Sequence, residues 1–478
     1  MIDSEAIARA TPPRRSDTID SIAILWAQYG PYHFPRASAL RQLAAPVQVH
    51  AMELASRTID YAWWRTPGFT GLMTLCPDSV VEELSFRAAF LRTRQELKRL
   101  GVRVCFLPSY APKTSLAALL AAKSLGVKAL MMNESHGGTA RASGVAAFVK
   151  RRLIALFDAA LVGGTPHKRY FASMGLPAER IFTGYDAVDN EYFARKAQEI
   201  RCQWSVVSGQ YDLPEHYFLS LGRFVAKKNL DTLIRAYALF LESHLPSHIS
   251  DLQIPHLVMV GSGEEEPALR ALCTELQLPI YDHAKGDHGP RTTDHRPQTT
   301  DHAARSAFRN PQSAIRNPGV HFYGFRQIDQ NPVFYAFADA FILPSLYEEW
   351  GLVVNEAMAS GLPVAVSETA GCAEDLLETG CPAGASPEDR MRIEQSGLAL
   401  KVRRNGFLFN PRSAEELSRA LLVFESSANL RALMGAESRR IVERFSCENF
   451  ARNAMRAVEA ALGKGARVLP AAAAMKLG

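Results

Sequence analysis

The sequence predicts a two-domain α/β protein in which two doubly wound domains face each other across a cleft. The chain has 478 residues, which is too long for one ordinary hydrophobic core. Short apolar runs alternate with amphipathic stretches, and this alternation is typical of the βα units that build parallel sheets. It occurs in two series, one in each half of the chain. Because open α/β sheets bind ligands at the carboxyl ends of their strands, two such domains predict a site between them.

The composition is that of a globular protein, with 47% hydrophobic and 22% charged residues. The net charge of +5 does not by itself indicate a nucleic-acid partner, and no dense stripe of basic and aromatic residues supports one. The seven cysteines contain no C-x-x-C pair, which favours a reduced compartment without a zinc site or a disulfide framework. The polar residues 1–20 lack the apolar region of a secretion signal, and no run approaches the roughly 20 apolar residues of a membrane span. We therefore expect a cytoplasmic protein.

The first series predicts an N-terminal domain over residues 21–200, after a flexible N-terminus at residues 1–20. Gly101 and Gly126 each follow an expected helix, where glycine most easily adopts the left-handed conformation that ends a helix. The expected strands cover residues 22–27, 102–107, 129–132 and 159–162, and the expected helices cover residues 84–100 and 115–125.

The second series predicts a C-terminal domain over residues 217–446, after a linker at residues 201–216. Inside this domain, residues 283–318 hold two imperfect polar repeats rich in proline, so we expect disorder there rather than a metal site built from their histidines. Residues 447–462 predict a terminal helix and residues 463–478 a loose tail. The expected strands cover residues 217–221, 256–260, 320–323, 340–343 and 363–366, and the expected helices cover residues 230–242, 267–276, 332–337, 351–360 and 414–424.

The most informative stretch is ILPSLYEEWGLVVNEAMASGLPV, at residues 342–364. A buried strand is expected to end just before Glu348, and a helix is expected to begin near Gly351, with Glu356 a turn or more inside it. Two carboxylates so placed can accept hydrogen bonds from hydroxyl groups at different points of one ligand. The helix N-terminus between them favours an anionic group. By itself, the same spacing fits an ordinary helix start equally well, with Glu356 facing solvent.

This string resembles the E-x7-E signature of retaining family 4 glycosyltransferases, which have the GT-B fold of two Rossmann-like domains facing across a cleft. The segment LSLGRFVAKKN, at residues 219–229, resembles the G-R-x(4)-K element of the same family. The resemblance implies that Arg223 and Lys228 stabilise the leaving diphosphate of a nucleoside-diphosphate sugar, a role that suits a guanidinium and an ammonium group. It also implies that Glu348 orients the donor sugar and that Glu356 binds the ribose hydroxyls.

Other segments follow the order of the family and imply a donor pocket between the domains. The string NESHGGTARASG, at residues 133–144, follows an N-terminal strand, and the resemblance places His136 near the reacting sugar or its phosphate. A structural histidine explains the same residue equally well. The terminal helix is expected to pack back on the first domain. The resemblance places these residues beside the donor: Gly30, Gly222, Gly263, Phe325, Arg326, Gly351, Leu352 and Gly371.

No D-x-D carboxylate pair appears in the chain. Because basic residues and helix N-termini would supply the positive field, we expect no divalent metal and no other cofactor. The partners implied are a nucleoside-diphosphate sugar and an acceptor glycan or lipid-linked glycan, without nucleic acid. The segment FVKRRLIALF, at residues 148–157, could lie on an anionic bilayer, but we favour a buried helix with Lys150, Arg151 and Arg152 on its solvated side. Peripheral membrane contact therefore stays open.

The function expected from the resemblance is retaining transfer of a sugar to an acceptor hydroxyl, in glycan, polysaccharide or glycolipid synthesis. Two alternatives remain. One is another GT-B enzyme, such as a phosphorylase or an epimerase. The other is a catalytically silent scaffold that binds nucleotide sugars, and the intact acidic and basic pairs speak against it.

Overall fold

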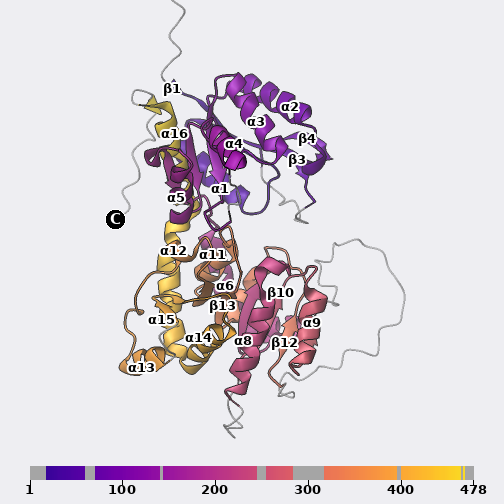
Figure 1. Cartoon of the computed structure of the whole chain (residues 1–478), viewed down its shortest axis with the longest axis vertical. Helices are drawn as coiled ribbons and strands as arrows, with labels where there is room; N and C mark the ends of the chain where they lie inside the picture. Colours follow the sequence, from indigo (N-terminus) through magenta and orange to yellow (C-terminus); the bar gives the residue numbers. More distant parts are fainter. Residues whose placement is uncertain are drawn as a thin grey trace, which may run out of the picture.

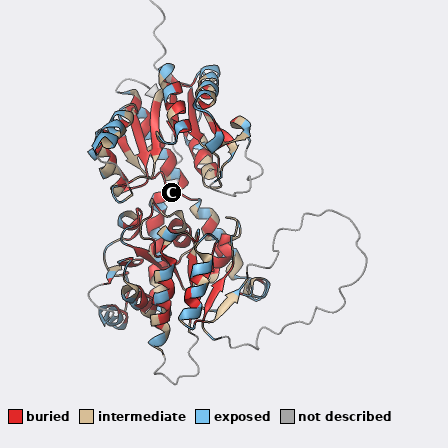
Figure 2. Ribbon diagram, turned by 45° about the vertical axis from the view of Figure 1, so that its right-hand side comes forward, coloured by how far each residue is buried: buried red, intermediate tan, exposed pale blue. Residues whose placement is uncertain are grey.

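The computed structural model describes residues 18–59, 70–139, 144–244, 254–283, 317–395, 400–463 and 467–468. Two α/β lobes lie one above the other, with the N-terminal half of the chain mainly in the upper lobe (Figure 1). Figure 2 shows that buried residues fill the sheet of each lobe, while the outward faces of many surrounding helices are exposed. The expectation of two doubly wound domains is therefore confirmed. The repeats expected to be disordered at residues 283–318 lie almost entirely outside the described residues.

Within the described residues, seven parallel strands form the N-terminal sheet in the order β4-β3-β2-β5-β6-β7-β8. The first long strand, β2, lies between β3 and β5, so the strand order reverses there. The strands are β2 (Ser21–Trp26), β3 (Gln48–Arg57), β4 (Leu72–Val80), β5 (Val104–Leu107), β6 (Lys128–Asn133), β7 (Ala159–Val162) and β8 (Ile181–Thr183). The helices are α1 (His33–Ala44), α2 (Phe86–Arg99), α3 (Lys113–Ser124), α4 (Gly144–Ile154) and α5 (Thr165–Ser173).

Among the same described ranges, eight strands form the C-terminal sheet in the order β11-β12-β10-β9-β13-β14-β16-β15, and only the edge strand β15 runs antiparallel to its neighbour. Here β9 lies between β10 and β13. The strands are β9 (Tyr217–Leu221), β10 (His256–Val260), β11 (Ile280–Asp282), β12 (Val320–Phe322), β13 (Ala340–Leu343), β14 (Val364–Ser367), β15 (Lys401–Arg403) and β16 (Gly406–Phe409). The helices are α8 (Leu230–Glu242), α9 (Glu266–Glu275), α10 (Asn331–Phe337), α11 (Leu352–Ala359), α12 (Ala373–Leu376), α13 (Pro387–Gln395), α14 (Ala414–Ser426) and α15 (Ala428–Val442).

The chain crosses between the domains through helices. α6 (Asn190–Arg201) packs on α10 and α11 of the C-terminal domain, and α7 (Trp204–Tyr211) follows it. The segment expected to be a plain linker therefore holds a helix, because Trp204 packs edge-on against Phe337 at 4.5 Å and Val207 joins the C-terminal core. α16 (Cys447–Leu462) returns to the N-terminal domain and packs along α1, where its alanines allow close approach (Figure 1). A short pair, β1 (Thr18–Ile19) with β17 (Arg467–Val468), lies near the two ends of the chain.

The expectation of a buried helix at residues 148–157 is wrong. In α4, Ile154 is buried, whereas Val145, Phe148 and Val149 are exposed. The helix meets the core of its domain at its C-terminal end, so most of its apolar side chains face solvent.

Candidate functional site

The candidate site forms where the C-terminal strand order reverses. β9 and β13 are neighbours in the sheet, with Phe218 opposite Ala340, so the loops that follow their carboxyl ends lie side by side. The backbone N–H of Leu346 donates to the carbonyl of Lys227 at 2.9 Å and joins the two loops. One loop carries the basic residues found in the sequence, and the other carries the acidic ones. A reversal of strand order is the usual place for a ligand in open α/β sheets.

Opposite charges meet at this junction. Lys228 Nζ donates to Glu348 Oε2, and Ser345 Oγ donates to the same oxygen at 3.1 Å. Next to this pair, Lys227 Nζ donates to Glu349 Oε2 at 2.6 Å. Glu348 is only 7% exposed, so its carboxylate is largely removed from water while it is paired with a cation. Arg223 lies earlier in the β9 loop and is exposed.

Glu356 lies on α11 and is fully buried. The alternative of an ordinary helix start with Glu356 facing solvent is therefore wrong. Its Oε2 accepts from Tyr335 at 2.9 Å and from Asn331 at 3.2 Å, and its Oε1 accepts from the hydroxyl of Tyr32 in the N-terminal domain. Burial raises the pKa of Glu356 to about 7, although the three hydrogen bonds act to lower it. In this conformation the carboxylate has protein partners on both oxygens, and a ligand would have to replace one of them.

The start of α11 depends on a glycine. Gly351 has φ of +104°, a backbone conformation that residues other than glycine rarely adopt. A Cβ added there would lie 3.0 Å from Leu343 Cδ2. The helix proper begins at Leu352, close to the predicted start. The N-terminus of α11 therefore follows directly on the Glu348 loop, and in its first turn the N–H of Val354 donates to the carbonyl of Gly351 at 2.9 Å.

Two histidines of the N-terminal domain hold this acidic loop from the opposite side. Gly138 N–H donates to Nδ1 of His136 at 3.2 Å, so Nε2 carries the proton and donates to the carbonyl of Glu348 at 2.9 Å. His167 has the same arrangement, accepting from Gly164 at Nδ1 and donating from Nε2 to the carbonyl of Glu349 at 2.9 Å. Burial lowers the pKa of His167 to about 4, which keeps the ring neutral. The ring N–H of His136 thus contacts backbone here.

His167 was missed in the sequence, although it carries the same signal as His136. Both residues follow the end of a buried parallel strand, β7 for His167 and β6 for His136. Tyr32 was also missed, and it too lies in a loop after a central strand, β2. A search for polar or aromatic residues in the segments directly after each predicted strand would have found both as candidate site residues.

Polar contacts further along the interface keep the domains together. Thr165 donates from its N–H and its hydroxyl to the carboxylate of Asp375, at 2.7 and 2.6 Å. Arg169 donates to both carboxylate oxygens of Glu374 at 2.6 Å, and Asn355 donates to the carbonyl of Asp186 at 3.2 Å. The described conformation is therefore a closed one.

Two acidic residues, Glu134 and the fully buried Asp186, lie beside this interface and were not found in the sequence. Burial raises the pKa of Glu134, and it raises the pKa of Asp186 well above its ordinary value. Both carboxylate oxygens of Asp186 are buried and have no hydrogen-bond partner among the described residues. Arg36, which is also buried, supplies the nearby positive charge.

Two of the predicted glycines are explained by close backbone approach. A Cβ on Gly371 would lie 1.9 Å from the carbonyl oxygen of Glu349, and one on Gly263 would lie 2.3 Å from that of Phe224. Gly222, with φ of +153°, donates to the carbonyl of Val260 at 3.0 Å. These glycines let neighbouring loops pack at the carboxyl end of the sheet.

The remaining predicted residues lie at the rims of the two sheets. Phe325 is 43% exposed after β12, and Arg326 donates from Nη1 to its carbonyl at 3.1 Å. The Nε and Nη2 atoms of Arg326 are buried and have no hydrogen-bond partner among the described residues. Gly30 accepts from the N–H of His33 at 3.0 Å at the start of α1.

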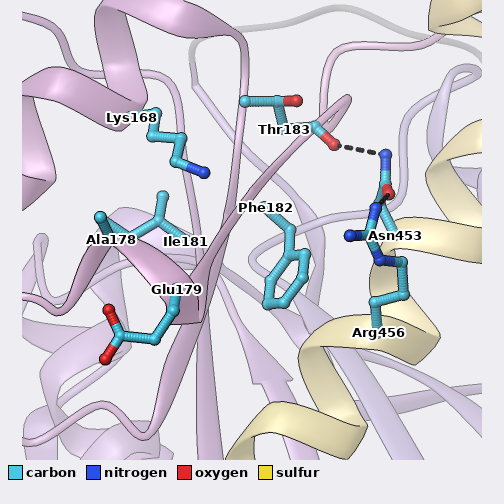
Figure 3. Close-up of a pocket in the computed structure, with 8 residues that line it drawn as sticks. All are labelled: Lys168, Ala178, Glu179, Ile181, Phe182, Thr183, Asn453 and Arg456. Atoms are coloured by element: carbon cyan, nitrogen blue, oxygen red, sulfur yellow. Dashed lines mark hydrogen bonds between the residues drawn. The ribbon is translucent and has the colours of Figure 1, made fainter.

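A separate pocket of about 370 Å³ lies between β8 and α16 in the N-terminal domain. Figure 3 shows Lys168, Phe182 and Arg456 around it, with Asn453 donating to the carbonyl of Thr183 at 3.0 Å. Its lining includes none of the residues that converge on Glu348, so we do not assign the site to it.

Within the part of the chain that the structure describes, no three His, Cys, Asp or Glu side chains are grouped so as to hold a metal ion. No helix in that part is both long and apolar enough to span a bilayer. All seven cysteines lie in described ranges and are free thiols.

The fold and the converging loops define a protein of the GT-B class. A solved structure of Anabaena Alr3699/HepE in complex with UDP superposes with a TM-score of 0.57 at 15% identity, covering 92% of this chain and 99% of that one. A sequence model of the family "Glycosyl transferases group 1" matches residues 300–424.

Two curated proteins are similar over part of the chain. Sulfoquinovosyl transferase SQD2 of Arabidopsis thaliana is 36% identical over 124 residues, which is 26% of this chain and 20% of that protein. The uncharacterized glycosyltransferase MJ1607 of Methanocaldococcus jannaschii is 30% identical over 160 residues, which is 34% of this chain and 29% of that protein. The chain thus spans less than a third of the length of either relative in these matches. Together the matches support a group 1 glycosyltransferase.

Proposed function

We propose that the protein transfers a sugar from a nucleoside-diphosphate donor to an acceptor hydroxyl, with retention of the anomeric configuration, as a family 4 enzyme. The observation that carries the proposal is the contact between Lys228 and Glu348 where β9 and β13 meet. A cation and a carboxylate in one largely buried place suit a ligand that has both a diphosphate and sugar hydroxyls. The family match over residues 300–424, which includes the E-x7-E string, supports the same assignment.

Each charged group has a separate role in this proposal. Arg223 and Lys228 stabilise negative charge as it develops on the departing diphosphate, which is electrostatic stabilisation of the transition state. Glu348 orients the donor sugar, and Glu356 accepts hydrogen bonds from the ribose. The leaving phosphate itself takes the proton of the acceptor, so no protein nucleophile is needed. Arg223, Lys228 and the N-terminus of α11 supply the positive field, and we propose that no divalent metal takes part.

Arg326 is proposed to contact the nucleobase together with Phe325. Two of its N–H-bearing atoms are buried without a partner in the described chain, and buried donors of this kind normally have an acceptor. A base that presents carbonyl oxygens would supply one. HepE, which has the same fold, was solved with UDP and with UDP-glucose, and uracil presents such oxygens.

The transfer is tested by incubating the full-length protein with a panel of nucleoside-diphosphate sugars, with and without glycan acceptors, and analysing the products by mass spectrometry. We expect nucleoside diphosphate to be released in step with a glycosylated product, and NMR of the new linkage to show the anomeric configuration of the donor. Glu348→Gln, nearly equal in size, should abolish most turnover. Nucleotide binding without turnover across the panel would favour the silent scaffold, and a rearranged sugar nucleotide would favour an epimerase.

A peripheral membrane position is proposed as well, through α4. Its exposed Val145, Phe148 and Val149 lie on the same helix as the exposed Arg151 and Arg152. A mixed apolar and basic surface of this kind complements an anionic bilayer. We expect co-sedimentation with vesicles rich in phosphatidylglycerol but not with phosphatidylcholine vesicles, and loss of it in Phe148→Ser. Equal behaviour with both vesicle types would reject the membrane position.

A further inference from the structure

Tyr32 reaches from one domain into the other. It lies in the loop between β2 and α1, at the reversal of the N-terminal sheet, and is only partly buried. Its ring packs on the apolar cluster of the C-terminal domain that contains Tyr335, Trp350 and Val354. Its hydroxyl donates to Oε1 of Glu356. Two independent contacts, one apolar and one polar, therefore place this N-terminal side chain at the proposed donor site.

The partners of Glu356 fall into two groups. Tyr335 and Asn331 lie on α10 of the same domain and donate to Oε2, so they stay with the carboxylate when the domains separate. Tyr32 donates to Oε1 from the opposite domain and leaves when the domains separate. Because Glu356 is fully buried in the closed form, a hydroxyl of a ligand can reach Oε1 only after Tyr32 has moved.

We propose that Tyr32 occupies, in the empty closed protein, the position that a hydroxyl of the donor takes on Glu356, so that it competes with the donor. This inference rests on the proposed donor-binding role of Glu356. Tyr32 is then a positioning residue that keeps a buried carboxylate hydrogen-bonded while no substrate is present. Donor binding exchanges one hydrogen bond to the carboxylate for another. The larger the population of the empty closed state, the weaker is the apparent affinity for the donor.

The competition predicts that removing the Tyr32 hydroxyl strengthens donor binding, whereas removing the hydroxyl of a residue that contacts the donor would weaken it. Removing the Tyr32 hydroxyl leaves one oxygen of a buried carboxylate without its donor, which destabilises the empty closed form and leaves the bound form unchanged. Tyr32→Phe keeps the ring on the apolar cluster. The variant should therefore bind the donor more tightly than the wild type, with a lower KM and a similar kcat.

The test titrates UDP, GDP and ADP separately into the full-length protein by calorimetry. For the nucleotide that the wild type binds, we expect Kd to fall about tenfold in Tyr32→Phe, equivalent to about 1.4 kcal/mol. Tyr192→Phe is the matched control, because Tyr192 packs on the same cluster near Glu356, and its Kd should equal that of the wild type. Small-angle scattering without nucleotide should show a larger radius of gyration for Tyr32→Phe alone.

Three other outcomes would contradict the competition or the proposed function. An unchanged or weaker Kd in Tyr32→Phe, with normal binding by the wild type, overturns the competition and makes Tyr32 a bystander or a direct ligand contact. An equal gain in Tyr192→Phe overturns it too, because the effect would then come from loosening the cluster. If the wild type binds none of the three nucleotides, the proposed function fails, and the inference fails with it.

Discussion

Replacing Glu356 by glutamine should make the stability of the protein less sensitive to pH. Burial raises the pKa of this carboxyl from 4.5 to about 7, so between these values the folded state holds a proton that the unfolded state has released. A carboxyl group of this kind lowers stability as the pH rises through that window, and the loss levels off above pH 7. Glutamine resembles the protonated carboxyl in shape and cannot ionise, so the variant lacks this loss.

The magnitude follows from the two pKa values. Integrating the proton linkage from pH 5 to pH 8 gives a loss of about 2.5 kcal/mol for the wild type that the variant does not have. For a domain of this size, that corresponds to about 5–10 °C in Tm. Thermal unfolding of both proteins is followed by circular dichroism at half-unit steps of pH. Groups other than Glu356 titrate alike in the two proteins, and they cancel in the difference.

The expected result is a difference in Tm between variant and wild type that widens steadily from pH 5 to about pH 7 and then stays constant. Parallel curves over the whole range would refute the reasoning, because they would mean that Glu356 ionises at its ordinary pH despite its burial. A difference that narrows with pH would show that the carboxylate form is the one the fold stabilises.

Three further predictions test the site. Arg223→Ala should slow turnover by roughly 10²–10³-fold, the usual cost of removing one preorganised group that stabilises the transition-state charge, with little change in the Kd of the sugar nucleotide. Glu356→Ala should chiefly raise that Kd. Small and equal effects of the two variants in steady-state kinetics and calorimetry would contradict the assigned roles. Gly371→Ala places a Cβ 1.9 Å from a neighbouring carbonyl oxygen, so Tm should fall by several degrees, and an unchanged Tm would show that the loop can relax. Lys228→Met leaves the largely buried carboxylate of Glu348 without its cation and should lower the free energy of unfolding by about 2–3 kcal/mol, less than for fully buried pairs. Adding Glu348→Gln should restore most of the lost stability, as measured by denaturant unfolding. Additive losses in the double variant would contradict a stabilising contact between Lys228 and Glu348.

Local patterns in the sequence predicted the regular elements well where the strands are buried on both faces. The apolar runs at residues 217–221, 256–260 and 340–343 are β9, β10 and β13 with the predicted bounds. β3 was not predicted, although it has buried residues along most of its length, because polar side chains such as His50 and Glu53 interrupt its apolar pattern. Elements at the domain boundary were also missed, since α7 is stabilised by contacts with the other half of the chain.

The basic and acidic residues that meet in the C-terminal domain were singled out because they stand at fixed spacings within two short strings. The loops after β9 and β13 each carry one kind of charge, and the strand order brings them together. By contrast, Tyr32, which contacts Glu356, and His167, which contacts Glu349, were not predicted, although Tyr32 lies two residues after Gly30, which the resemblance placed beside the donor. No local pattern connects them to those residues.

The sequence by itself determined the two α/β domains, the start of α11 and the acidic and basic pairs, because each depends on periodicity or spacing over a few residues. Only the tertiary structure decided that Glu356 is buried rather than exposed, that α4 presents its apolar residues to solvent, and that His136 contacts the backbone of the opposite domain. The physical reason is distance along the chain. Tyr32 and Glu356 are 324 positions apart, and the burial and pKa of a side chain are set by whatever the fold brings against it.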